Sequence, residues 1–165
     1  GVFHRISSGT TRDGLEVFGK MEKGYLLSVD SNWDMYGDGY LSGHYFSEGA
    51  LREQLEKAYP GLVFTEEPVE NQINMYKRDK VGHILFLTVG NKTISGEEFR
   101  QLLELPSSNF TMQAADGKIR FLCKGQGHGL GLSQYGGNVL AKEGKSYKEI
   151  LRYYFPECGV QKKDS

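Results

Sequence analysis

Glycine spacing in one segment constrains this chain more than any other feature of its sequence. Residues 125–137 read GQGHGLGLSQYGG, and every second position from 125 to 131 is glycine. A backbone without Cβ atoms can adopt positive φ angles and can lie directly against a flat ligand or another strand. The spacing therefore predicts either a binding surface or a tight crossing of two backbone segments, and the residues alone favour neither.

The same segment gives His128 an unusual position. Between its glycines the loop carries only Gln126, His128 and Leu130 as side chains. A helix is predicted directly after it, over residues 133–143, and the free N–H groups of a helix N-terminus favour polar or anionic partners. Beside His128 we therefore expect three further candidate binding residues, Ser133, Gln134 and Tyr135. The alternative is a scaffold role, in which His128 is hydrogen-bonded to nearby backbone.

Size and charge exclude several classes of function. The chain has 165 residues and a mass of 18.5 kDa, which predicts a single domain, residues 1–165, with one core. Its 20 basic and 21 acidic residues give a net charge of -1, which is no electrostatic signature of a nucleic-acid partner. The longest apolar run, residues 84–89, is far shorter than the roughly 20 residues needed to span a bilayer.

The residue types predict neither a metal site nor a cofactor. Cys123 and Cys158 are too few for a disulfide-rich scaffold or a cysteine-built zinc site. They form one bridge at most, and burial as small apolar groups is the favoured alternative. The histidines at positions 4, 44, 83 and 128 have no partner at i+2 or i+4. Segments that resemble a phosphate loop and a calcium loop each lack a required glycine.

Hydrophobic periodicity predicts an α+β fold with a mixed, mainly antiparallel sheet and three to four short helices. Strands are expected over residues 2–6, 25–29, 71–77, 82–89, 110–113 and 118–123. Capping residues and the 3.6-residue period predict helices over residues 49–59, 95–105, 133–143 and 146–154. The expected caps are Ser47 and the capping boxes of Ser95 with Glu98 and Ser146 with Glu149, and the Asp-Gly pair at 116–117 predicts a hairpin. Strands and helices do not alternate as in βαβ units, which excludes a parallel doubly wound sheet.

The glycine-dense segment also carries a family resemblance. The pattern GxGHGxGxSQYG, followed by Ala141, Gly144, Ser146 and two tyrosines at 153–154, resembles the C-terminal signature of the stage II sporulation protein D family. The resemblance continues upstream through residues 3–11, 25–34 and 95–110, in order, and so covers nearly the whole chain. It implies that the chain is the C-terminal portion of a larger domain of this family.

The resemblance implies work on peptidoglycan outside the bacterial membrane. Sporulation members of the family are lytic transglycosylases that cleave denuded glycan strands, which have lost their stem peptides, during engulfment or wall remodelling. A cell-wall amidase of the stage II sporulation protein P type is the implied partner, and other relatives are described as amidase enhancers. The full-length protein would be extracytoplasmic, either membrane-anchored or associated with the wall.

One departure from the family concerns the catalytic acid. The resemblance implies a glutamate in a Glu-Met-Pro segment and a Cys/His zinc cluster, both upstream of the turn that contains His4. Neither pattern occurs in this sequence. The catalytic residue therefore stays unknown, and it is left open whether the chain is an enzyme. Asp34 is the carboxylate of most interest, with a local Asx-turn as the favoured alternative.

The resemblance implies a glycan-binding groove between the first turn and the glycine loop. Its residues would be His4, Ser7 and Thr11 from the turn, facing His128, Ser133, Gln134 and Tyr135. Arg100 joins this set because a guanidinium suits the lactate carboxylate of a muramyl sugar. An ion pair with Glu97 or Glu104 on the same helix is an equal alternative for Arg100.

Two functions of different class follow from these residues. The first is binding of peptidoglycan glycan strands, with cleavage of those strands in the full-length protein. The second is a non-catalytic wall-binding or amidase-activating module, and the missing acid motivates it. Without an upstream half, the strand over residues 84–89 would have an open edge, which predicts a homodimer of the truncated chain.

Overall fold

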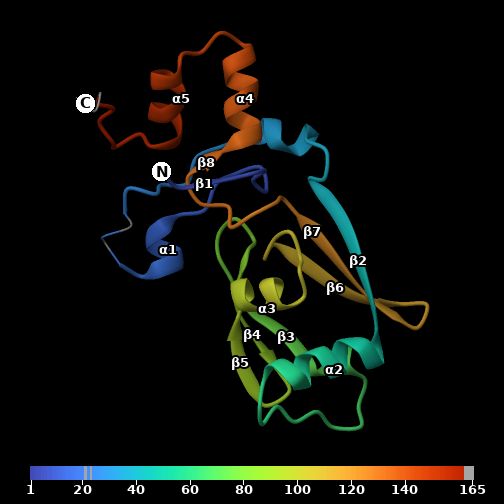
Figure 1. Cartoon of the computed structure of the whole chain (residues 1–165). Helices are drawn as coiled ribbons and strands as arrows, with labels where there is room; N and C mark the ends of the chain where they lie inside the picture. The colour runs from blue at the N-terminus through green and yellow to red at the C-terminus, as the bar shows by residue number, and fades with distance from the viewer. Residues whose placement is uncertain (21, 23, 162–165) are drawn as a thin grey trace. The chain divides into compact units, whose positions relative to one another are not determined.

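The computed structural model describes residues 1–20, 22 and 24–161, which form the expected α+β fold with mainly antiparallel sheets (Figure 1). Contacts divide the chain into two compact units: unit 1 is Gly1–Tyr40 with Gly125–Ser165, and unit 2 is Leu41–Lys124. The single domain expected from the chain length stays a prediction. Within the described residues, every helix is too short or too polar to cross a membrane.

Unit 2 contains two three-stranded antiparallel sheets and the apolar core. Its elements are, in chain order, β2 (Leu41–Ser47), α2 (Glu48–Ala58), the 3-10 helix η3 (Val69–Gln72), β3 (Ile73–Arg78), β4 (Ile84–Val89), β5 (Lys92–Ser95), α3 (Gly96–Leu102), β6 (Phe110–Ala115) and β7 (Lys118–Lys124). The strand orders are β2–β7–β6 and β3–β4–β5. Phe99, Phe110 and Phe121 are at most 1% exposed and pack ring against ring at the centre of the core.

Local sequence signals in unit 2 are confirmed. The hydroxyl of Ser47 accepts the N–H of Ala50 at the start of α2, and Ser95 caps α3 in the same way. The Asp-Gly pair at 116–117 has positive φ at both residues and turns the chain from β6 into β7. The prediction of an open edge at residues 84–89 is wrong, because β4 lies between β3 and β5. That basis for a homodimer is therefore removed.

Unit 1 brings together the two ends of the described chain. Its elements are β1 (Phe3–His4), α1 (Gly14–Phe18), the 3-10 helix η2 (Asn32–Tyr36), β8 (Leu132–Ser133), α4 (Gln134–Lys142) and α5 (Tyr147–Tyr154). Strands β1 and β8 pair in parallel, with His4 opposite Ser133. Helices α4 and α5 lie side by side (Figure 1). The predicted capping box of Ser146 and Glu149 is present at the start of α5.

The strand predicted over residues 25–29 does not form. The N–H of Thr11 donates to the Val29 carbonyl at 2.9 Å, but the N–H of Val29 donates to Thr11 Oγ1 at 2.9 Å. A side-chain hydroxyl thus takes the place of a backbone carbonyl, and a regular ladder of backbone bonds cannot continue. What remains near this segment is an isolated bridge between Thr10 and Asp30.

The interior of unit 1 is largely polar. Its buried polar side chains are His4, Ser7, Thr11, Arg12, Ser31, Asp34 and Ser133. The contiguous cluster of buried apolar residues lies in unit 2 instead. Since buried polar groups need hydrogen-bond partners, unit 1 depends on its hydrogen bonds and on close backbone contact more than on apolar burial.

Candidate functional site

The glycine loop, residues 125–131, lies against the N-terminal segment of the chain. The glycines at 125, 127, 129 and 131 have φ between +70° and +103°. A Cβ added to Gly125 would lie 2.9 Å from the carbonyl oxygen of Ile6, and one added to Gly127 would lie 2.9 Å from the Cβ of His4. The glycine spacing is therefore explained by a tight crossing of two backbone segments.

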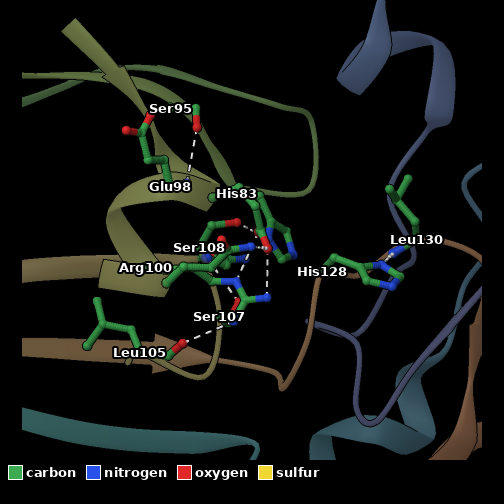
Figure 2. Close-up of polar contacts among 12 residues, drawn as sticks. His83, Ser95, Glu98, Arg100, Leu105, Ser107, Ser108, His128 and Leu130 are labelled. Atoms are coloured by element: carbon green, nitrogen blue, oxygen red, sulfur yellow. Dashed lines mark hydrogen bonds and ion pairs between the residues drawn. The ribbon is translucent and has the colours of Figure 1, made fainter. Parts of the chain in front are cut away.

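This crossing brings His4 and His128 together. Their ring centroids are 5.9 Å apart in an edge-to-face arrangement. Both rings bond the backbone of Leu130. His4 Nδ1 lies 3.0 Å from the Leu130 carbonyl oxygen. The Leu130 N–H donates to His128 Nδ1 at 3.1 Å (Figure 2). The backbone bond expected from a scaffold role is thus present, while His128 stays half-buried next to a second histidine.

Burial controls the charge of His4, which is only 4% exposed. Burial lowers the pKa of His4 to about 4; the bond to Leu130 and the charge of Asp34 raise that pKa, and His128 lowers it. His4 is therefore neutral at physiological pH. Its Nε2 atom is buried and has no hydrogen-bond partner among the described residues. An unsatisfied acceptor of this kind needs an explanation.

Two further candidates, Ser7 and Thr11, support the first turn from inside. The N–H of Ser7 donates to Asp34 Oδ2 at 2.6 Å, and Ser7 Oγ accepts the N–H of Gly9 at 3.1 Å. Thr11 is fully buried and bonds the segment around Val29. Both side chains fix the shape of the turn that carries His4, and direct contact between them and a glycan stays a prediction.

The start of α4 adds the remaining candidates of unit 1. Ser133 lies opposite His4 in the β1–β8 pair, and its hydroxyl caps α4 by accepting the N–H of Gly136 at 3.2 Å. Gln134 is exposed and Tyr135 is half-buried. The structure therefore brings the histidine pair and the first residues of α4 into one region of unit 1.

Arg100 belongs to unit 2 and already has partners there (Figure 2). Its Nε and Nη2 donate to the two carboxylate oxygens of Glu97 at 2.9 and 2.7 Å, and its Nη1 donates to the Leu105 carbonyl at 3.2 Å. This is the ion pair expected as the alternative to glycan recognition. Recognition of a lactate carboxylate by Arg100 stays a prediction.

The substitutions Arg100→Lys and Glu97→Gln separate these two roles. Each replaces the two-point ion pair by a weaker contact, and Arg100→Lys also loses the guanidinium bond to the Leu105 carbonyl. Each is expected to lower the free energy of unfolding by about 1 kcal/mol in urea titrations. Equal binding of glycan strands by both variants would contradict a role in recognition. Weaker binding by Arg100→Lys alone would support that role.

A buried polar cluster around Asp34 was missed from the sequence. Asp34 forms no Asx-turn, contrary to expectation: its Oδ2 bonds Ser7, 27 residues earlier in the chain, and its buried Oδ1 has no partner among the described residues. The hydroxyls of Ser31 and Tyr154 lie 2.8 Å apart in the same interior. Burial raises the pKa of Tyr154 to about 12, so this phenol stays protonated. Gly136 makes room, because a Cβ there would clash with the Tyr154 hydroxyl.

Arg12 is a second residue that sequence reasoning missed. It is 4% exposed. Its side-chain Nη1 donates to the carbonyl of His128 at 3.1 Å, and its backbone N–H donates to the Gly129 carbonyl at 2.8 Å. Its guanidinium therefore holds the glycine loop from the N-terminal segment. No local pattern indicates this role, because the carbonyl that it bonds lies 116 residues later.

Metal-binding and redox groups are scarce in the part of the chain that the structure describes. It contains no group of three or more His, Cys, Asp or Glu side chains that could hold a metal ion. Cys123 and Cys158 are both free, so the bridge that the sequence allowed does not form. Burial raises the pKa of the Cys123 thiol to about 11.

Comparison with known proteins tests the family resemblance. No family model matches the chain. The stage II sporulation protein D of Bacillus amyloliquefaciens is 30% identical over 163 residues, which are 99% of this chain and 45% of that protein. The stage II sporulation protein D of Bacillus subtilis strain 168 is 28% identical over 164 residues. These matches support the resemblance to the stage II sporulation protein D family.

The family match covers only part of the longer proteins. The chain spans less than half the length of either stage II sporulation protein D. The amidase enhancer of Bacillus subtilis strain 168 is also similar, with 32% identity over 88 residues, which are 53% of this chain and 12% of that protein. The resemblance found from the sequence is thus confirmed, and the activity of the longer proteins comes to this chain only as a proposal.

Proposed function

We propose that this chain binds peptidoglycan glycan strands and that, in a longer protein, it serves a lytic transglycosylase that acts on the wall during sporulation. The observation that carries this proposal is the match to stage II sporulation protein D along 99% of the chain. The histidine pair supports it, because both histidines lie in segments on which the family resemblance rests.

The chemistry around the histidine pair suits a glycan. A glycan strand presents apolar ring faces, and hydroxyl and N-acetyl groups around the ring edges. Binding it needs an apolar contact surface with a few converging hydrogen-bond groups. Tyr135 offers a half-buried ring, Gln134 an exposed amide and His128 a half-buried imidazole. Their donors and acceptors match hydroxyl and amide groups rather than a charged ligand.

Cleavage needs a carboxylic acid that protonates the leaving oxygen of the glycosidic bond. Asp34 is fully buried, and its Oδ2 accepts the N–H of Ser7 at 2.6 Å. A carboxylate held in this way has no access to a strand on the surface. The proposal therefore takes the acid from a part of the longer protein that this chain does not match.

Strand binding without cleavage is the expected behaviour of the isolated chain. Purified residues 1–165 are expected to bind glycan strands freed of stem peptides, measured by titration calorimetry, and to release no anhydromuramic product. Strands that retain their stem peptides are the comparison, since the peptides would hinder access to the sugars. Absence of binding would contradict the proposed function, and anhydromuramic product would show that this chain supplies its own acid.

The match to an amidase enhancer favours a second function, activation of a cell-wall amidase. In that case the chain would raise the rate at which an amidase of the stage II sporulation protein P type releases stem peptides, without binding denuded strands itself. A rate assay with and without the chain distinguishes the two functions. Both place the longer protein outside the cytoplasm, membrane-anchored or associated with the wall.

A further inference from the structure

A groove in unit 1 is formed by the end of α4, the turn after it and one face of α5. Its volume is about 330 Å³, which is near the lower end of the range for ligand pockets and suits one sugar unit. It uses none of the residues around the histidine pair. The lining residues are Leu140, Lys145, Glu149, Ile150, Arg152 and Tyr153.

The groove combines an apolar floor with a charged rim. Leu140 is 6% exposed and Ile150 is half-buried, so these two side chains form the floor. Lys145, Glu149 and Arg152 are exposed at its edge. The lining residues therefore present two positive charges and one negative charge beside an apolar surface.

The carboxylate of Glu149 does not cancel both cations. Its Oε2 accepts the N–H and the hydroxyl of Ser146 at 2.8 and 2.7 Å, as part of the capping box of α5. These bonds lower the pKa of Glu149, and the charges of Lys145 and Arg152 lower it further. One carboxylate thus lies near two cations, and the rim keeps one positive charge in excess. An anionic group complements it.

Tyr153 forms a wall of the groove and is held in place before any ligand binds. Its hydroxyl donates to the Asp30 carbonyl at 2.6 Å. Its ring lies edge-to-face with the rings of Trp33 and Tyr154, at centroid distances of 5.7 and 5.2 Å. The ring is nevertheless 38% exposed. An aromatic surface fixed in this way loses little side-chain entropy when a ligand packs against it.

We propose that this groove binds one N-acetylmuramic acid unit of a denuded glycan strand, with the sugar against Tyr153 and its lactate carboxylate between Lys145 and Arg152. The inference rests on the proposed glycan binding and adds a contact that recognises the acidic sugar. Removal of the stem peptide by hydrolysis of its amide bond leaves this carboxylate free and charged. N-acetylglucosamine lacks the group, and a peptide-bearing muramyl unit has an amide in its place.

The floor and the wall favour a sugar over other anions. A phosphate or an acidic side chain would satisfy the two cations alone. A muramyl unit also places an apolar ring face on Leu140, Ile150 and Tyr153, while its hydroxyls stay in water. The carboxylate and the ring are parts of one ligand, so the charged rim and the apolar floor are both used.

Chitin oligosaccharides provide the decisive comparison, because they share the N-acetylated β-1,4-linked backbone and lack lactate groups. In titration calorimetry, residues 1–165 are expected to bind peptide-free glycan strands more tightly than chitin oligosaccharides of equal length. Arg152→Gln and Lys145→Gln should each lower affinity for the strands about fivefold, as expected for an exposed ion pair, and leave affinity for chitin unchanged. Lys148→Gln is the matched control, since Lys148 is exposed on α5 but does not line the groove.

Nuclear magnetic resonance of the wild type places the ligand without any substitution. Peptide-free strands are expected to shift the methyl resonances of Ile150 and the ring resonances of Tyr153. The methyl groups of Ile84, which is buried in the core of unit 2, serve as the reference and should not move. Unmoved Ile150 and Tyr153 resonances in a chain that binds strands would overturn the inference.

The remaining outcomes separate this inference from the proposed function. Strand affinity that falls equally in Arg152→Gln, Lys145→Gln and Lys148→Gln, or in none of them, would overturn the groove and leave glycan binding in place. Equal wild-type affinity for strands and chitin would overturn recognition of the lactate carboxylate. Arg152→Gln that binds phosphatidylglycerol vesicles more weakly and strands unchanged would assign the groove to a lipid surface instead. No wild-type binding of strands would overturn both the groove and the proposed function.

Discussion

Gly131→Ala is expected to destabilise the chain by at least about 3 kcal/mol, because two penalties combine at this position. Gly131 has a φ of +70°, and a left-handed conformation costs an L-residue about 1–2 kcal/mol. An added Cβ would also collide with the carbonyl oxygen of Val2. That oxygen accepts the N–H of Leu132 at 3.0 Å, so moving it away breaks a bond beside the β1–β8 pair.

Gly117→Ala is the matched control for Gly131→Ala. Gly117 has nearly the same φ, +71°, but a Cβ there would meet no described atom within 4 Å. It is therefore expected to show the conformational penalty alone, about 1 kcal/mol. Urea unfolding followed by circular dichroism measures both variants. Equal losses would mean that the loop crossing has room for a side chain, against the packing described here.

Acidification is expected to destabilise the wild type through His4, by up to about 3 kcal/mol between pH 6.5 and pH 4. The pKa of His4 is lowered from 6.5 to about 4, chiefly by burial. Above pH 6.5 His4 is neutral in both states, so its contribution is fully present. As the pH falls through this window, the unfolded chain binds a proton that the folded chain refuses, and stability is lost. Below pH 4 both states are protonated and the loss levels off.

The variant His4→Asn isolates this contribution, because the remaining histidines and carboxylates are the same in both proteins. Its urea midpoint should fall less steeply than that of the wild type between pH 6.5 and 4. The difference in slope should approach one bound proton near the middle of the window. Parallel curves would show that His4 binds its proton equally well in the folded and the unfolded chain, against a pKa lowered by burial.

Elements defined by neighbouring residues could be predicted from the sequence. Local hydrogen bonds and turn geometry define the caps at Ser47, Ser95 and Ser146 and the Asp-Gly turn at 116–117. The interacting residues are only a few positions apart, so the sequence alone shows them together. The strand expected over residues 25–29 failed because its partner was the Thr11 hydroxyl, and hydrophobic pattern contains no information about such a bond. The short helix α1 was not predicted at all.

The glycines in the sequence located the candidate site, but the hydrogen bonds inside it could not be predicted. Alternating glycine indicated that a ligand or another backbone segment approaches residues 125–131 closely. In the structure that partner is the N-terminal segment that carries His4. The burial of Arg12 and the bond from Ser7 to Asp34 both join residues far apart in sequence. Bonds of this kind arise only once the fold exists. One resemblance, between this loop and a family signature, nevertheless placed the two histidines in one region.

Strands β2 and β7 have a consequence for how the site assembles. Unit 2 leaves unit 1 after Tyr40 and returns at Gly125, and its first and last residues, Leu41 and Lys124, are paired in the β2–β7 register. Unit 2 is continuous in sequence and has its own apolar core, so it can fold first and close this loop. The histidines at 4 and 128 are then joined through residues 5–40 and 125–127 rather than through the whole inserted unit as well. The entropic cost of bringing the two histidines together is then lower than in the fully unfolded chain. The site therefore has a lower effective contact order than its sequence separation suggests.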